Sequence, residues 1–167
     1  MNSVLIIEDE KDICDAVRYA LEKEGCKVHS SNDGIKGLFL AAKVLPDLVI
    51  LDLMLPGMNG MDICRKLKAD PKTAGIPVVI LSAKSSETDK IGCFELGADD
   101  YVTKPFSIGE LIARLKAVSK RNSDPGRKNR YFRKGNMEID PSGRSVTLNG
   151  REIDLSLKEY DLLHYLA

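Results

Sequence analysis

Residues 48–60 read Leu48-Val-Ile-Leu-Asp-Leu-Met-Leu-Pro-Gly-Met-Asn-Gly60. The first four residues are apolar, which is typical of a strand buried on both faces in the middle of a parallel sheet. The Pro-Gly pair predicts a turn shortly afterwards. Asp52 stands between strand and turn, so we expect its carboxylate at the carboxyl end of a central strand.

Short apolar runs alternate with stretches of helical period from the N-terminus to residue 119. This alternation predicts five βα repeats, an α/β fold with a parallel sheet. We expect strands at residues 4–7, 27–30, 48–51, 77–82 and 101–103, and helices at residues 12–24, 34–44, 60–69, 86–96 and 107–119. An open sheet of this kind binds its ligands beyond the carboxyl ends of its strands.

The amino-acid composition changes after residue 119. Residues 120–130 are polar and contain a Pro-Gly turn, so we expect a linker between one domain at 1–119 and a second at 131–167. Residues 136–140, 145–148 and 151–154 alternate apolar with polar, and Asn149-Gly150 is a strong hairpin signal; a small antiparallel β-meander is predicted. Residues 157–167 have a helical pattern, and we expect the start of a helix there.

The composition favours a globular protein of the cytoplasm. Lys and Arg total 25 and Asp and Glu total 25, so the net charge of +0 gives no whole-chain attraction to nucleic acid or membrane. We find neither a membrane-length apolar run nor the basic start of a secretory signal, and expect no membrane partner. The four cysteines lack zinc-site spacing, and His29 and His164 stand apart from any ligand or nucleophile.

Several chemically active residues follow the predicted strands. They are Asp9, Asp52, Ser82 and Lys104. Neighbouring carboxylates repel each other, so we expect a hard divalent cation among them. Mg²⁺, or Mn²⁺ in its place, prefers such oxygen ligands. Asp9 and Asp52 are candidates for direct ligands, Glu8 for a ligand through water, and the backbone carbonyl of Met54 for a further one.

The same residues favour phosphoryl-transfer chemistry. An aspartate such as Asp52 can attack a phosphoryl donor and form an acyl phosphate. Lys104 would pair with the phosphoryl oxygens, and the Ser82 hydroxyl would hydrogen-bond to the incoming group. An acid after a strand is also a common helix N-cap, so Asp9 or Asp12, taken singly, has a purely structural interpretation.

Four segments together resemble the receiver domain of two-component response regulators. They are Ile6-Ile-Glu-Asp-Glu10, residues 48–60, Pro77-Val-Val-Ile-Leu-Ser-Ala83 and Gly97-Ala-Asp-Asp-Tyr-Val-Thr-Lys-Pro-Phe106. The resemblance implies a flavodoxin-like, doubly wound (βα)5 fold. It implies that Asp52 accepts phosphate from the phosphohistidine of a sensor histidine kinase, and that Glu8, Asp9 and the Met54 carbonyl organise Mg²⁺.

The resemblance also implies a switch. Ser82 and Lys104 become the residues that respond to the phosphoryl group, and Tyr101 the switch aromatic. By sequence alone, Tyr101 near a strand end would be a packing residue. In this family the bond between Lys104 and Pro105 is typically cis. Such a domain is a phosphoacceptor and not an enzyme; it catalyses only its own phosphorylation and dephosphorylation.

Residues 131–167 resemble the beginning of a winged-helix effector domain of the OmpR/PhoB type. The recognition helix and wing of that family would lie downstream of Ala167, so we expect an incomplete domain, from a truncation or a gene fragment. Promoter binding and transcriptional control are then expected only of a longer chain. The basic cluster in residues 120–134 has two interpretations, a phosphate-contacting patch or a solvated linker.

The resemblance further implies a twofold dimer, formed on phosphorylation through the fourth helix, fifth strand and fifth helix. Its candidate residues are Lys90, Glu95, Asp99, Asp100, Glu110, Arg114 and Arg121. Lys90 with Glu110, and Asp100 with Arg121, are the expected partners. An ordinary solvated surface of mixed charge is the alternative.

Two other functions share parts of this pattern. A phosphatase of the haloacid dehalogenase type also uses an aspartyl nucleophile, but it expects a second acid two residues later, where Met54 stands. A flavodoxin-like module could instead bind a nucleotide or flavin, but Gly57-Met-Asn-Gly60 is a sparse glycine pattern for a phosphate-cradling loop.

Overall fold

The computed structural model describes residues 1–123, 132–140, 145–153 and 155. The chain divides into two compact units, Met1–Lys120 and Arg121–Ala167. Among the described residues, no helix combines the length and apolar character that crossing a membrane requires.

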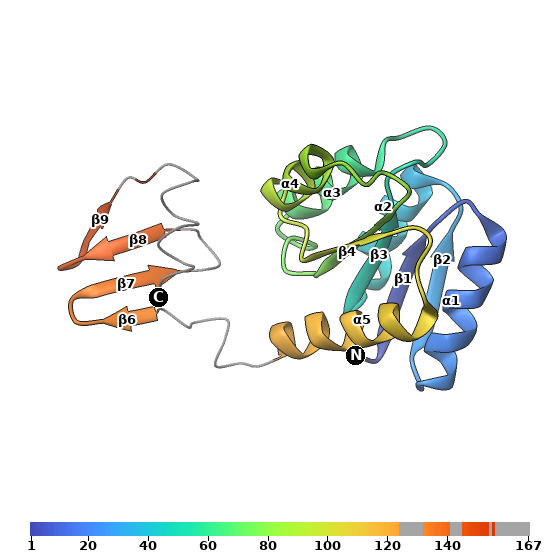
Figure 1. Ribbon diagram of the computed structural model, residues 1–167, viewed down its shortest axis with the longest axis horizontal. Coiled ribbons are helices and arrows are strands. Elements are labelled where there is room, and N and C mark those ends of the chain that lie inside the picture. The colour runs from blue at the N-terminus through green and yellow to red at the C-terminus, as the bar shows by residue number, and fades with distance from the viewer. Residues whose placement is uncertain (124–131, 141–144, 154, 156–167) are drawn as a thin grey trace. The chain divides into compact units, whose positions relative to one another are not determined.

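The first unit is a five-stranded parallel sheet with helices on both faces (Figure 1). The strands are β1 (Ser3–Ile7), β2 (Lys27–Ser31), β3 (Leu48–Asp52), β4 (Val78–Ser82) and β5 (Asp100–Thr103). The helices are α1 (Lys11–Lys23), α2 (Gly34–Val44), α3 (Gly60–Ala69), α4 (Glu87–Glu95) and α5 (Ile108–Ser123). The strand order β2-β1-β3-β4-β5 reverses direction between β1 and β3, which confirms the doubly wound, flavodoxin-like prediction.

Alternate residues of the strands feed two separate cores, one on each face of the sheet. Leu5, Val49 and Ile80 pack in the core that contains buried residues of α2, α3 and α4. Ile6, Ile50 and their neighbours pack in the core that contains buried residues of α1 and α5. Every residue of β3 is buried, so the strand that carries Asp52 is rigidly held from both sides.

Helix α5 ends at Ser123, four residues beyond the predicted end at residue 119. Residues 120–123 are therefore helical, where the sequence predicted a linker. Lysine and arginine are good helix formers, so a polar composition alone does not end a helix. The remainder of the predicted linker, residues 124–130, lies outside the described residues.

The second unit contains an antiparallel sheet of order β6-β7-β8-β9. Its strands are β6 (Phe132–Lys134), β7 (Met137–Asp140), β8 (Ser145–Leu148) and β9 (Arg151–Ile153). The last three confirm the predicted meander, and Asn149 and Gly150 both have positive φ, as a tight hairpin turn requires. Strand β6 was not predicted because it is short and carries two charges. The Gly135-Asn136 pair that follows it indicates a turn and could have revealed the strand. The predicted helix at residues 157–167 lies outside the described residues.

Candidate functional site

The strand register brings the predicted residues to one edge of the sheet. Ile7 pairs with Leu51, so Glu8 and Asp52, each one residue further along, leave the sheet side by side. Ser82 pairs with Thr103, and Lys104 follows directly, with its backbone N–H donating to the Ser82 carbonyl at 2.8 Å. The Lys104–Pro105 peptide bond is cis, as expected.

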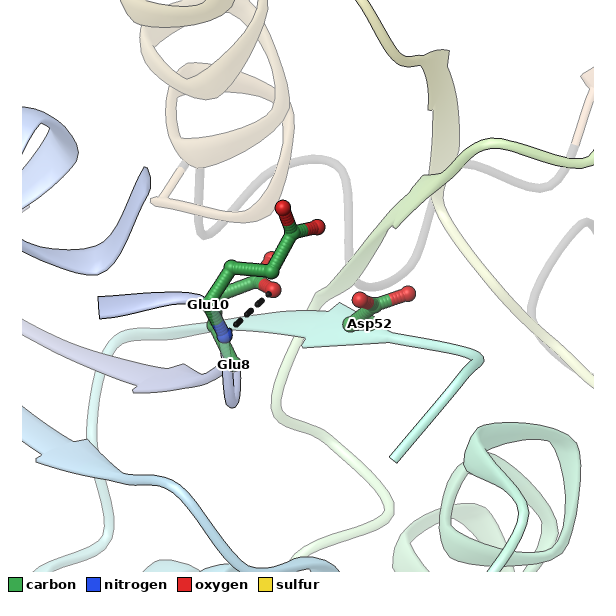
Figure 2. Close-up of side chains that lie close together, drawn as sticks. All are labelled: Glu8, Glu10 and Asp52. Carbon is green, nitrogen blue, oxygen red and sulfur yellow. Dashed lines mark hydrogen bonds between the residues drawn. The ribbon is translucent and has the colours of Figure 1, made fainter. Parts of the chain in front are cut away.

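The ammonium group of Lys104 sits among three carboxylates. Its Nζ lies 2.8 Å from Oδ2 of Asp52, 3.0 Å from Oε1 of Glu8 and 2.9 Å from Oε1 of Glu10. Figure 2 shows the three acids, with a dashed line for the 3.2 Å hydrogen bond that the Glu10 backbone N–H donates to Oε1 of Glu8. Four residues from three separate parts of the chain thus form one charged cluster.

Burial strengthens the electrostatics of this cluster. Glu8 is 1% exposed and Asp52 is 3% exposed, so their charges are poorly solvated. Burial raises the pKa of Glu8 to about 7, with the Asp52 charge adding to the rise and Lys104 opposing it. Burial opposes the charge on Lys104, but hydrogen bonds to Asp52, Glu10 and Glu8 outweigh it and raise the Lys104 pKa above its ordinary value.

The donor set fits a hard divalent cation. One oxygen from each of Glu8, Glu10 and Asp52 can be chosen so that all three lie within 4.8 Å of one another. Oε2 of Glu8 accepts no hydrogen bond, although it lies 2.9 Å from Nζ of Lys104, so a buried oxygen is left with unused acceptor capacity. Carboxylate oxygens with spare acceptor capacity are the ligands that Mg²⁺ prefers.

The structure adds an acid to the cluster that the sequence did not assign. Glu10, which the sequence analysis did not assign, joins the cluster with Glu8 and Asp52, whereas Asp9 is exposed and is not among its members. Asp9 lines an adjacent pocket of about 550 Å³ that Glu8 also borders. A ligand role for Asp9 stays a prediction, as does one for the Met54 carbonyl; the Met54 N–H donates to Oδ1 of Asp52 at 3.0 Å.

Ser82 and Tyr101 meet at one point of the loop after β4. Ser82 is fully buried, and its Oγ accepts a hydrogen bond from the Lys84 N–H at 3.1 Å. The Tyr101 hydroxyl donates to the Lys84 carbonyl at 2.8 Å, and the residue is 8% exposed. Burial raises the pKa of Tyr101. Both side chains are therefore linked to the same residue, Lys84, which precedes α4.

A glycine keeps the loop after Asp52 close to the following helix. The Gly60 N–H donates to the Leu53 carbonyl at 3.0 Å. A Cβ at Gly60 would overlap the Asp52 carbonyl oxygen and lie 2.6 Å from Cα of Leu53. Only glycine allows α3 to begin this close to the end of β3, so the turn at residues 53–59 is held against the phosphoacceptor candidate.

Four of the predicted dimer residues, Asp99, Asp100, Glu110 and Arg114, form ion pairs within one chain. Arg114 binds Glu110 at 3.0 Å and Asp100 at 3.4 Å. Asp99 binds Lys68 at 2.9 Å. Arg114 therefore holds both Glu110 and Asp100 within one chain, and the pairs expected across the dimer, Lys90 with Glu110 and Asp100 with Arg121, stay predictions. The interface role stays a prediction. Helix α4 also exposes Ile91 and Phe94, which charge patterning did not reveal.

A parallel α/β sheet with a buried aspartate, neighbouring acids and a converging lysine at its carboxyl edge defines a phosphoacceptor domain. The chain is 45% identical over 169 residues to the sensory transduction protein RegX3 of Mycolicibacterium smegmatis, covering 99% of this chain and 73% of the relative. Residues 4–116 match the response regulator receiver domain. The chain belongs to the response regulator receiver family.

Solved structures agree with this assignment. The receiver domain of Klebsiella pneumoniae RstA, in a BeF3-activated form, superposes with a TM-score of 0.66 at 32% identity, covering 71% of this chain and 99% of that one. The receiver domain of a sensor histidine kinase from Pseudomonas aeruginosa has a magnesium ion coordinated in its active-site cleft; it gives a TM-score of 0.66 at 26% identity, covering 71% and 98%. The protein is thus a two-component response regulator with a role in a phosphorelay.

Proposed function

We propose that Asp52 is the phosphoacceptor and that Lys104 neutralises the charge of the transferred group. The observation that carries this proposal is the 2.8 Å contact between Nζ of Lys104 and Oδ2 of a buried Asp52. A phosphoryl group on Asp52 would add negative charge and acceptor oxygens within reach of the same ammonium.

In the proposed step, a carboxylate oxygen of Asp52 attacks the phosphorus of a phosphohistidine on a sensor histidine kinase. The new O–P bond makes an acyl phosphate while the N–P bond breaks, and the imidazole leaves with the electron pair and takes up a proton. Mg²⁺, or Mn²⁺ with the same preference for oxygen, would be held by Glu8 and Asp52 and would supply charge neutralisation. Asp9 would complete this acidic shell.

The phosphoryl signal is proposed to leave through the loop before α4. Ser82 lies at the end of β4, and both it and Tyr101 bind Lys84. If the Ser82 hydroxyl turns to a phosphoryl oxygen, it releases the Lys84 N–H and loosens the loop that also holds Tyr101. The surface of α4, β5 and α5 would then form a twofold dimer, and a longer chain would bind promoter DNA and control transcription.

The test is phosphorylation by acetyl phosphate with Mg²⁺, read by intact mass. We expect the wild-type chain to gain the mass of one phosphoryl group and Asp52→Asn to gain none. Asp62→Asn, which changes an exposed acid paired with Arg65, is the matched control and should behave as wild type. Undiminished incorporation by Asp52→Asn would refute the assignment, and sustained release of phosphate from unrelated phosphomonoesters would favour a phosphatase instead.

A further inference from the structure

The Glu10 side chain makes no hydrogen bond to the helix that it precedes. Glu10 is the N-cap residue of α1, a position where a side chain ordinarily accepts a hydrogen bond from the first turn of the helix, yet its carboxylate makes no such bond. Instead, Oε1 of Glu10 lies 2.9 Å from Nζ of Lys104, 94 residues away in the chain. The Glu10 side chain therefore contacts Lys104 and does not cap α1.

Glu10 differs from the other two acids around Lys104 in its exposure. The Glu10 side chain is 59% exposed, whereas those of Glu8 and Asp52 are 0% and 4% exposed. A buried acid is fixed in the site, but an exposed one can turn into water at little cost. Glu10 is therefore the member of the cluster that can release Lys104.

We propose that Glu10 is a positioning residue that holds Lys104 in the resting state and opposes the phosphorylated one. The effect of Glu10 is electrostatic, and it rests on the proposed role of Asp52 as the phosphoacceptor. The Glu10 carboxylate attracts the ammonium group that a phosphoryl group needs, and it repels the phosphoryl oxygens themselves. A phosphoryl group on Asp52 draws Lys104 onto its own oxygens, and Glu10 loses its partner and turns to solvent.

The proposal predicts that removing this one charge favours the phosphorylated form. The probe is beryllofluoride, a phosphoryl analogue, titrated at saturating Mg²⁺ and followed by fluorine NMR. Glu10→Gln should bind it roughly two- to fivefold more tightly than wild type, the range expected of one partly exposed ion pair. The matched control is Asp12→Asn, which removes an exposed acid two residues along α1 that makes no ion pair with Lys104 in the described structure; it should differ less than twofold.

A second readout tests the contact itself, without any phosphoryl analogue. In urea unfolding, Glu10→Gln and Lys104→Met should be coupled, changing the unfolding equilibrium by roughly two- to fivefold beyond additivity. Asp12→Asn and Lys104→Met should be additive.

Unchanged or weaker beryllofluoride binding by Glu10→Gln, an equal gain in Asp12→Asn, or additivity with Lys104→Met would each overturn the proposal. Failure of the wild-type chain to bind beryllofluoride with Mg²⁺ would instead refute the proposed function on which it rests.

Discussion

Replacing Glu8 with glutamine should stabilise the metal-free protein above neutral pH and leave its stability nearly unchanged at about pH 4. In the folded chain, burial raises the pKa of Glu8 from 4.5 to about 7, so the folded state holds this proton to a higher pH than the unfolded chain does. Wild-type stability must therefore fall as pH rises from 4.5 to about 7, and the loss is complete above that range.

The size of this stability difference follows from how far the pKa of Glu8 is raised in the folded chain. At about 1.4 kcal/mol per pH unit, ionising Glu8 in the folded chain costs about 3 kcal/mol of stability relative to its protonated form. An amide of the same shape resembles the protonated acid and never ionises. Glu8→Gln should therefore gain up to about 3 kcal/mol over wild type at about pH 8, in the presence of a chelator.

Urea unfolding followed by far-ultraviolet circular dichroism measures this difference, because the chain has no tryptophan and its described helices lie in or begin in the first unit. Glu22→Gln, an exposed acid on α1, is the control and should show the wild-type dependence on pH. Added Mg²⁺ should stabilise wild type more than Glu8→Gln, since the amide removes a ligand charge. Equal pH dependence in wild type and Glu8→Gln, or a variant less stable than wild type at the higher pH, would refute the reasoning.

Three further changes test the fold around the site. Gly60→Ala sets a methyl group against the Asp52 carbonyl and should cost about 1–3 kcal/mol in urea unfolding, so a neutral result would contradict the close approach. Ile50→Ala empties a fully buried position of the central strand and should cost about 2–5 kcal/mol; a loss well below this range would mean that the core collapses around it. Tyr101→Phe removes the hydrogen bond to Lys84 and should cost about 1 kcal/mol, whereas unchanged stability would show that water replaces the hydroxyl.

The strand ends could be predicted from the sequence because a parallel sheet gathers all carboxyl ends at one edge. The apolar runs that precede Asp52, Ser82 and Lys104 were therefore enough to predict that these three residues lie at the same edge of the sheet. The contact of Glu10 with Lys104 could not be predicted in the same way. Glu10 lies beyond the strand end, with an extended backbone at the start of α1 (φ −74°, ψ 103°), and strand-end patterns do not specify where a residue in such a connection directs its side chain.

Surface contacts were harder to predict for a related reason. A charge pattern identifies which residues can form ion pairs. A flexible side chain can reach several partners at similar distances, so the pattern does not predict which pair forms. Arg114 takes both Glu110 and Asp100 within the chain, so the intermolecular pairs expected from the pattern compete with existing intramolecular ones. A dimer that uses these carboxylates must either break those pairs or extend them into a network across the interface.

The formal charges of the cluster suggest a role for the exposed Glu10 beside the buried Glu8 and Asp52. With all groups ionised, the three carboxylates and Lys104 leave an excess of negative charge that one divalent cation can balance. Phosphoryl transfer to Asp52 replaces one carboxylate charge with a group of charge about −2. The balanced site therefore gains negative charge. Glu8 is buried and cannot move its carboxylate away from that charge into water. Glu10 can relieve it by rotating into water, which gives the site a neutral resting state and a phosphorylated state that differs in the partner of Lys104.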